Sequence, residues 1–241
     1  MVERYIVGTS GAYHSGVRTD VEYGPLARYA VDLAGVNGRA PKFGYLATAS
    51  GDQKARLAER AEAARLQGWQ FNPLTVFMMP NVEDPREYLL DQDVIWVDGG
   101  SVVNLLALWR AHGLDDIMRE AWEKGIVLAG VSAGSMCWHI GGATDSFGPE
   151  LRKVSNGLAL LPYGNGVHYG VNPLRRIQIG EMVSEGVFER AYSSEDGIGL
   201  VYRGTELVEV ISDRDDVYGW NTFLDGDEVV EERMVPRRLP D

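Results

Sequence analysis

The sequence predicts an α/β fold built on a parallel β-sheet. In the first half of the chain, short runs of β-branched and aromatic residues alternate with longer segments of helical periodicity. Strands separated by helices of this length are typical of parallel βαβ units, in which helices cover both faces of the sheet. A further observation bears on chemistry as well as fold. Residues Gly130-Val131-Ser132-Ala133-Gly134 read G-x-S-x-G and directly follow an apolar run.

The expected elements of the first half follow one another in this alternating order. Strands are predicted where apolar and β-branched residues cluster in short runs, at 4–8, 42–48, 74–78, 93–97 and 126–129. Helices are predicted where apolar residues recur at helical spacing, or where Ala, Arg and Glu dominate, at 25–33, 53–66, 102–111 and 114–123. Parallel strands end at one edge of the sheet, and ligands of such sheets bind there.

The second half has a different pattern. Residues 157–162 and 166–169 are expected to form a strand and a loop, and 177–192 has the periodicity of a helix. The runs 197–202 and 206–211 predict a β-hairpin. The tail from Asp225 is expected to hold a short strand or to fray. Because no repeat, low-complexity tract or clear linker divides the sequence, residues 1–241 are expected to form a single domain.

Composition limits the classes of partner. Lys and Arg number 23 against 35 Asp and Glu, and the net charge of −12 argues against nucleic acid and anionic membranes. The single cysteine, Cys137, excludes an internal disulfide and fits a reducing compartment. The N-terminus lacks the pattern of a signal peptide, and no apolar run approaches 18 residues. We therefore expect a cytoplasmic protein without a membrane partner.

The G-x-S-x-G element predicts a nucleophilic serine at Ser132. In a strand–turn–helix context, the sharp turn lifts the hydroxyl out of the sheet, and the N–H of Ala133 points at a developing oxyanion. The alternative interpretation is an ordinary glycine-rich βα loop. Cys137 lies in the helix that follows and is most simply a small core residue, which argues against a cysteine nucleophile.

A serine nucleophile needs a base within hydrogen-bond reach, and histidine is the usual one. Of the four histidines, His168 has the best position, because it follows a glycine-rich segment at the expected end of a strand. His14 lies in a polar loop at the same edge, where a solvated histidine is common. His112 is expected to cap a helix C-terminus, and His139 to pack on the helix after Ser132.

The histidine in turn needs an acid. Asp145 lies between Ser132 and His168 in the sequence, although it could equally cap a turn. Spacing leaves four other acids open, namely Glu150, Glu181, Glu195 and Asp196.

The second oxyanion donor is expected in the turn Asp98-Gly99-Gly100-Ser101, from Gly99 or Gly100. A dinucleotide phosphate loop is the alternative interpretation of this turn. It is disfavoured because the third glycine of G-x-G-x-x-G is missing.

Several segments, in this order, resemble the peptidase E family of aspartyl dipeptidases, with cyanophycinase as a more distant relative. They are Trp96–Ser101, Asn104–Trp109, Val127–Ser135, Thr144–Gly148, Gly157–Pro162 and Val167–Tyr169. The resemblance implies a three-layer α/β/α sandwich similar to class I glutamine amidotransferases. It also implies a Ser-His-Asp/Glu triad that cleaves dipeptides with an N-terminal aspartate.

By the same resemblance, Ser132 is the nucleophile, His168 the base and Asp145 the third member of the triad. Gly100 and Ala133 supply the oxyanion donors.

Relatives carry an arginine for the substrate carboxylate shortly after the histidine, which implies this role for Arg175 or Arg176. A surface basic pair is the alternative for these two residues. No cofactor is expected, and no two histidines have the spacing of metal ligands among acids. The expected partner is a small peptide, and the sequence is compatible with a homodimer.

Two other functions share some of these features. An α/β-hydrolase esterase has the same pentapeptide and the order Ser, Asp, His, but usually places its histidine far towards the C-terminus. No histidine follows His168. A non-catalytic binding module on the same fold is the second alternative.

Overall fold

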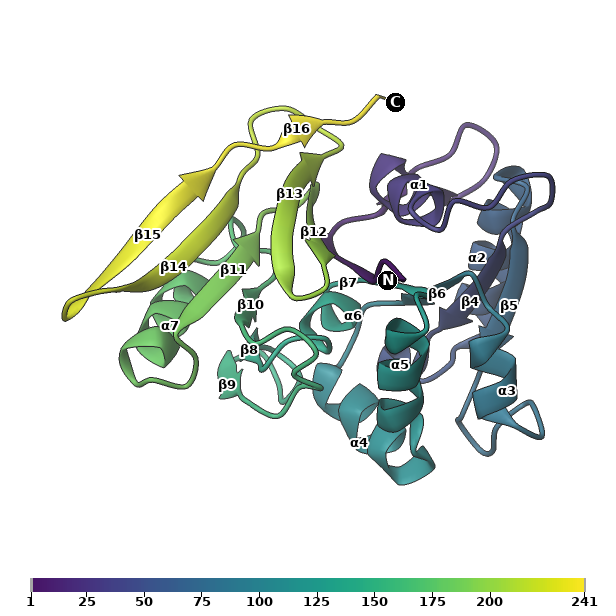
Figure 1. Ribbon diagram of the computed structural model, residues 1–241, viewed down its shortest axis with the longest axis horizontal. Coiled ribbons are helices and arrows are strands. Elements are labelled where there is room, and N and C mark those ends of the chain that lie inside the picture. The colour runs from purple at the N-terminus through teal and green to yellow at the C-terminus, as the bar shows by residue number, and fades with distance from the viewer. Residues whose placement is uncertain (1, 241) are drawn as a thin grey trace.

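The computed structural model describes residues 2–240, and over this range it is organised around an eight-stranded sheet (Figure 1). The strand order is β16-β13-β12-β1-β7-β6-β4-β5. Neighbouring strands from β1 to β5 in this order are parallel, whereas β12 and β13 add antiparallel strands beside β1. The strands are β1 (Tyr5–Ser10), β4 (Lys42–Leu46), β5 (Gln70–Leu74), β6 (Val94–Val97), β7 (Val127–Val131), β12 (Ile198–Arg203), β13 (Glu206–Ser212) and β16 (Arg237–Arg238). The predicted α/β fold with a mostly parallel central sheet is confirmed.

Alternate residues of the central strands contribute to two separate hydrophobic clusters, because successive side chains of a strand point to opposite faces. In β6, Ile95 and Val97 belong to one cluster, together with residues of α4 and α5. Val94 and Trp96 belong to the other, together with residues of α1 and α2. Helices therefore contribute to both clusters. They are α1 (Pro25–Asp32), α2 (Lys54–Leu66), α4 (Val102–His112) and α5 (Leu114–Glu123).

A second sheet of order β10-β11-β14-β15 lies beside the central one. Figure 1 shows β14 and β15 extending away from the central sheet as a long ribbon, with α7 alongside them. Ile179, Met182 and Val183 of α7 pack there with Phe188 and Ala191 in a small core of their own. The elements are β10 (Gly164–Gly166), β11 (Arg190–Ser194), β14 (Gly219–Asp225), β15 (Glu228–Met234) and α7 (Pro173–Ser184).

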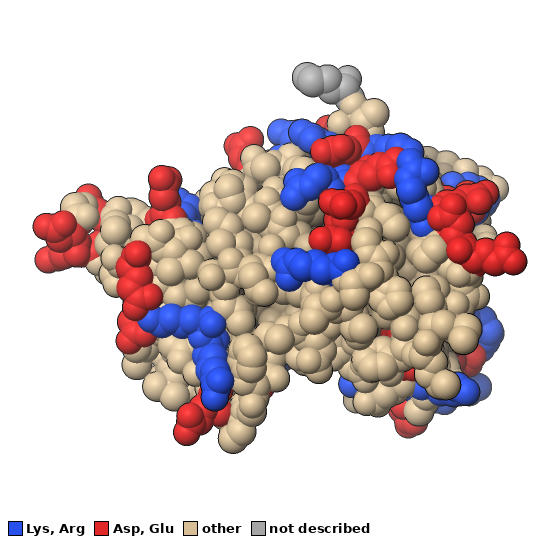
Figure 2. Space-filling model, turned by 90° about the horizontal axis from the view of Figure 1, so that it is seen from below, with Lys and Arg blue, Asp and Glu red and all other residues tan. Residues whose placement is uncertain are grey.

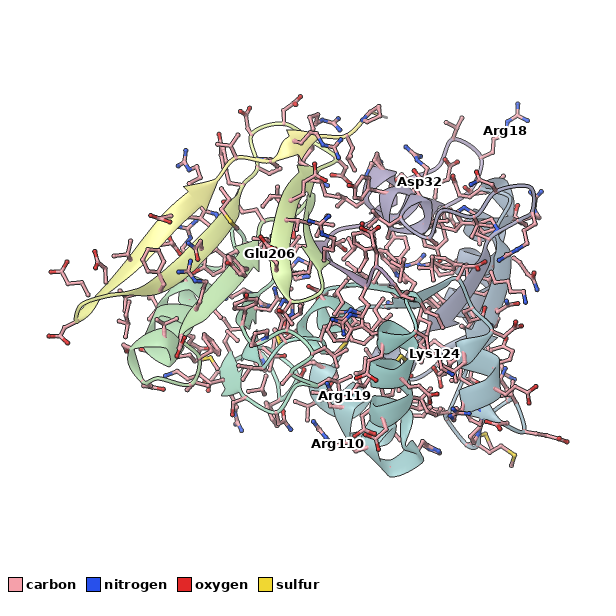
Figure 3. All side chains as sticks on the ribbon, viewed as in Figure 1. Arg18, Asp32, Arg110, Arg119, Lys124 and Glu206 are labelled. Atoms are coloured by element: carbon pink, nitrogen blue, oxygen red, sulfur yellow. The ribbon has the colours of Figure 1, made fainter. Side chains whose placement is uncertain are left out.

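Short elements complete the described chain. They are β2 (Tyr13–His14), β3 (Glu22–Tyr23), the 3-10 turn η1 (Thr48–Ser50), α3 (Pro85–Leu90), α6 (Ala133–Met136), β8 (Gly142–Thr144) and β9 (Arg152–Val154). Irregular chain links β9 to β10, and arginines of two helices hold it. Arg110 of α4 donates to the carbonyl of Asn156, and Arg119 of α5 donates to that of Leu158 at 3.0 Å. Figure 3 shows both labelled side chains on the same side of the molecule.

Two sequence predictions in the first and middle parts were wrong in position. The strand expected at 74–78 is β5, at Gln70–Leu74, and it contains Pro73. The proline is tolerated because β5 is the edge strand of its sheet. The segment 157–162 forms no strand, and the nearest strand is β10, at Gly164–Gly166.

The helix predicted at 177–192 is displaced towards the N-terminus. Pro173 occupies the first turn of α7, and Asn172 caps it by accepting the N–H of Leu174 at 3.0 Å. The helix ends at Ser184, and Gly186 follows at a φ of +72°. A glycine in this left-handed conformation just beyond the last turn is a common helix terminator. Residues Arg190–Ser194 are then free to form β11.

The predicted hairpin is confirmed as β12 and β13. The strand expected in the tail is β15, which pairs along its whole length with β14. Within residues 2–240, none of the helices has the length and apolar character needed to span a bilayer. Figure 2 shows acidic and basic side chains close to one another over this face, with uncharged surface between the groups.

Candidate active site

Ser132 lies at a sharp turn between β7 and α6. Its φ of 57° and ψ of −112° are unusual for a residue with a side chain, and strain of this kind marks functional turns. Two glycines make the turn sterically feasible. A Cβ on Gly134 would lie 2.0 Å from the carbonyl oxygen of Val97, and one on Gly130 would lie 2.4 Å from the oxygen of Gly134. The pentapeptide therefore has the tight geometry that the sequence predicted.

The turn after β6 lies against Ser132. A Cβ placed on Gly99 would be 3.3 Å from the Cβ of Ser132. The N–H of Gly99 donates to Oδ1 of Asp98 at 2.9 Å, so it is already occupied. Gly100 has a φ of +141°, and its N–H has no hydrogen-bond partner among residues 2–240. Between the two glycines that the sequence left open, Gly100 is thus the open donor.

A buried network fixes that turn. Asp98 is 2% exposed, and its carboxylate accepts the hydroxyls of Tyr13 at 3.0 Å and Tyr45 at 2.5 Å. Arg56 donates to the same carboxylate at 3.4 Å, and Arg60 approaches it at 3.9 Å. Because a buried carboxylate must be hydrogen-bonded or paired, this network holds Asp98 and the glycine turn in one arrangement.

The end of β1 connects Ser132 with His168. The carbonyl of Thr9 accepts the N–H of Ser132 at 2.9 Å, and the next residue, Ser10, accepts the N–H of His168 on its hydroxyl at 3.0 Å. Val167, which precedes the histidine, lines the same pocket as Ser132. Among residues 2–240, no hydrogen bond joins the side chains of Ser132 and His168. Such bonds are often long in ligand-free sites and tighten when substrate binds.

The acid beside His168 is Asp196. Nδ1 of His168 lies 2.5 Å from Oδ1 of Asp196, which follows β11. This hydrogen bond is the main cause of the lowered pKa of Asp196, and Arg214 and Arg175 lower it further. A carboxylate at Nδ1 fixes the tautomer in which Nε2 can accept a proton.

The prediction that Asp145 pairs with His168 was therefore wrong. Asp145 directly follows β8, and its Oδ2 lies 3.4 Å from Nη2 of Arg175. Sequence order had favoured Asp145, whereas the folding of β11 against β10 brings Asp196 to the histidine. A partial signal was present, since Asp196 was one of the acids that sequence spacing left open and it directly precedes a glycine, Gly197.

A small, narrow pocket lies over Ser132. Its lining includes both oxyanion candidates and two charged side chains, and consists of Gly100, Val102, Ser132, Ala133, Met136, Thr144, Asp145, Val167 and Arg175. Arg175 is 7% exposed, and its Nη1 donates to the carbonyl of Ala143 at 2.9 Å. Burial lowers the pKa of Arg175, but an arginine stays charged at neutral pH.

The two neighbouring arginines have different environments. Arg176 does not line the pocket, because it pairs with Glu231 of β15 at 2.7 Å and stacks 3.9 Å over the ring of Trp220. The structure therefore brings Arg175 to Ser132 and binds Arg176 to the second sheet.

The remaining histidines lie apart from this pocket. His139 is fully buried between the carbonyl of Ser135 and the hydroxyl of Tyr202, and burial lowers its pKa to about 4. His14 pairs with Asp213 at 2.8 Å, and His112 ends α4.

Cys137 is also buried, and burial raises the pKa of its thiol. It therefore lacks the lowered thiol pKa and the exposure of a reactive cysteine. Within residues 2–240, no group of three or more His, Cys, Asp or Glu side chains could hold a metal ion.

Comparison with known proteins finds similar peptidases. A model of peptidase family S51 matches residues 22–210. The uncharacterized peptidase YgaJ of Bacillus subtilis (strain 168) is 33% identical over 191 residues, which cover 79% of this chain and 82% of that protein. Peptidase E of Shewanella denitrificans is 32% identical over 104 residues, or 43% of this chain and 44% of the relative.

A solved structure supports the fold. The crystal structure of a peptidase from an acI-B1 actinobacterium aligns with a TM-score of 0.65 at 18% identity, over 96% of this chain and 95% of that one. The family match covers most of the chain, and the relative from Bacillus subtilis matches over most of its own length. The chain therefore belongs to peptidase family S51 and is a serine peptidase of the peptidase E type.

Proposed function

We propose that this peptidase is a dipeptidase that hydrolyses short peptides with an N-terminal aspartate, through an acyl-enzyme on Ser132. One observation carries the proposal: the buried guanidinium of Arg175 lines the same small pocket as Ser132. A carboxylate held by that guanidinium would place the adjoining carbonyl carbon near the serine hydroxyl. Arginine suits this task because its donors can bind both oxygens of a carboxylate.

The proposed chemistry assigns a role to each group. Ser132 Oγ attacks the carbonyl carbon while Nε2 of His168 accepts its proton, and Asp196 stabilises the resulting imidazolium. The N–H groups of Gly100 and Ala133 bind the oxyanion. His168 returns the proton to the leaving amine, and water then hydrolyses the ester with His168 as base again.

The charge of the pocket supports an acidic side chain at the first position. Arg175 is the one cation among the described residues that line it. A desolvated arginine would be left without its partner by an apolar substrate, and sites of this kind reject substrates that lack the matching polar group.

The arrangement of the elements supports one further part of the proposal. The elbow lies at the carboxyl end of β7, a central strand, and helices pack on both faces of the sheet. We assign the fold on this basis to the three-layer type of class I glutamine amidotransferases.

Hydrolysis of Asp-Leu and of aspartyl p-nitroanilide tests the function, with Leu-Leu and leucyl p-nitroanilide as neutral controls. The wild-type protein should hydrolyse the aspartyl substrates at least about 100-fold faster in kcat/KM than the neutral ones. Ser132→Ala should abolish turnover and labelling by a fluorophosphonate probe, while Ser135→Ala should remain labelled. Turnover that survives Ser132→Ala, or a preference for the leucyl substrates, would refute the proposal.

A further inference from the structure

Asp145 has no role in the proposed catalysis, yet it lines the pocket over Ser132. Its side chain is 62% exposed, and among the described lining residues it is the one carboxylate, as Arg175 is the one cation. The pocket therefore presents a positive and a negative group side by side, with Nη2 of Arg175 3.4 Å from Oδ2 of Asp145. An anion-binding pocket for a simple carboxylate has no need of the acid.

We propose that Asp145 binds the α-ammonium group of the substrate and so restricts the enzyme to free N-termini. The inference rests on the proposed aspartyl dipeptidase function. An N-terminal aspartate is a zwitterion, in which the ammonium and the carboxymethyl group are attached to the same carbon. The pair Arg175 and Asp145 has the complementary charges at a comparable separation, so each could bind one end of that residue.

The geometry of Asp145 suits a binding role. Its separation from Arg175 is longer than the 2.7–2.9 Å of a strong charge-assisted bond, so neither partner is saturated. The backbone around Asp145 is nevertheless fixed. Thr144 Oγ1 accepts the N–H of Ser146 at 3.1 Å, and the carbonyl of Asp145 accepts the N–H of Gly148 at 3.1 Å. The carboxylate is therefore held at the mouth of the pocket with capacity for another donor.

A merely structural role makes a different prediction. If Asp145 only held Arg175 in place, its loss would weaken every substrate that uses Arg175, with or without an ammonium group. If it binds the ammonium, the loss should fall on substrates that carry this group. The two roles are separated by a substrate that keeps the carboxylate and lacks the amine.

Aspartyl p-nitroanilide and its desamino analogue, succinic acid mono-p-nitroanilide, form such a pair. Wild-type enzyme should prefer the aspartyl compound by about 10- to 100-fold in kcat/KM, the effect of one charge-assisted hydrogen bond. In Asp145→Asn this preference should shrink to about threefold or less, mainly through a loss on the aspartyl substrate. Asp227→Asn, in the exposed β14–β15 turn, removes the same charge elsewhere and should keep the wild-type preference.

Fluorophosphonate labelling of Ser132 in Asp145→Asn should match wild type and shows that the variant is folded. Equal losses on both substrates in Asp145→Asn, or a wild-type enzyme that does not distinguish them, would overturn the ammonium site and leave the aspartyl activity standing. If the wild-type enzyme hydrolysed neither substrate, both the aspartyl activity and this inference would be overturned.

Discussion

Asp196 hydrogen-bonds to Nδ1 of His168 at 2.5 Å, although 28 positions separate the two residues in the sequence. The contact exists because the chain folds β11 between β10 and β14, and Asp196 lies two residues beyond the end of β11. It gives the histidine the orientation that a general base for Ser132 requires. The first prediction concerns this pair.

Replacing Asp196 with Asn should lower kcat by about 10³- to 10⁴-fold, because the histidine loses the acceptor that fixes its tautomer. KM should change little, since Asp196 does not line the pocket. Steady-state kinetics with aspartyl p-nitroanilide measure both constants. Fluorophosphonate labelling should slow in Asp196→Asn and stay fast in Asp145→Asn. The reverse order would restore Asp145 as the partner of the histidine.

Replacing Arg175 with Met should reduce kcat/KM for aspartyl p-nitroanilide by at least about 100-fold, because the substrate carboxylate loses its charged partner in a buried pocket. Arg176→Met is the matched control. Arg176 pairs with Glu231 outside the pocket, so its loss should change kcat/KM by less than about threefold. Comparable losses in the two variants would show that Arg175 has no special role in binding the substrate.

Replacing Gly134 with Ala should destabilise the protein by about 3 kcal/mol or more, since the added Cβ would lie 2.0 Å from the backbone oxygen of Val97. Gly180 offers a control within a helix. There the nearest atom to an added Cβ is 3.6 Å away, and alanine should stabilise α7 by up to about 1 kcal/mol. Urea unfolding of both variants measures the difference. A Gly134→Ala protein as stable as wild type would contradict the tight elbow.

Acid should destabilise the protein through His139. Its pKa is about 4 in the folded protein against an ordinary 6.5, so between these values the unfolded chain binds more protons than the native one. Stability from this residue is therefore present at neutral pH and is lost as the pH falls below about 6.5. From pH 7 to pH 5 the loss should be about 1–2 kcal/mol.

His139→Gln provides the comparison for this effect, because other groups titrate alike in both proteins. Between pH 7 and pH 5, the free energy of unfolding of His139→Gln, measured with urea, should fall by about 1–2 kcal/mol less than that of wild type. An equal fall of the free energy of unfolding in the two proteins would mean that His139 is not held in its neutral form.

Local patterns predicted the parts of the fold that local interactions determine. Helix α5 begins and ends at the predicted residues Leu114 and Glu123, and α1, α2 and α4 differ from prediction by one residue at an end. The error at 177–192 came from weighing periodicity above Gly186, whose place beyond the last turn marks a helix end. The second sheet was missed because β11 and β14 pair across distant parts of the sequence.

The candidate site likewise has features that local sequence predicts and features that depend on the fold. Five consecutive residues determine the elbow at Ser132, because the turn has no room for a side chain at Gly130 or Gly134. The distinction between Gly99 and Gly100 depended on the carboxylate of Asp98, which occupies one N–H and leaves the other open. Sequence spacing contains no such information.

By itself, the sequence determined the alternating α/β order, the serine elbow and the likeness to the peptidase E family, because each is carried by short runs of consecutive residues. Only the tertiary structure decided that Asp196 pairs with His168, that Asp145 lies beside Arg175, and that Arg176 belongs to the second sheet. These contacts join strands and helices that are distant in the chain. Their partners are selected by the register of β11 and the placement of α7, and many acids at similar sequence spacing could have met the same histidine.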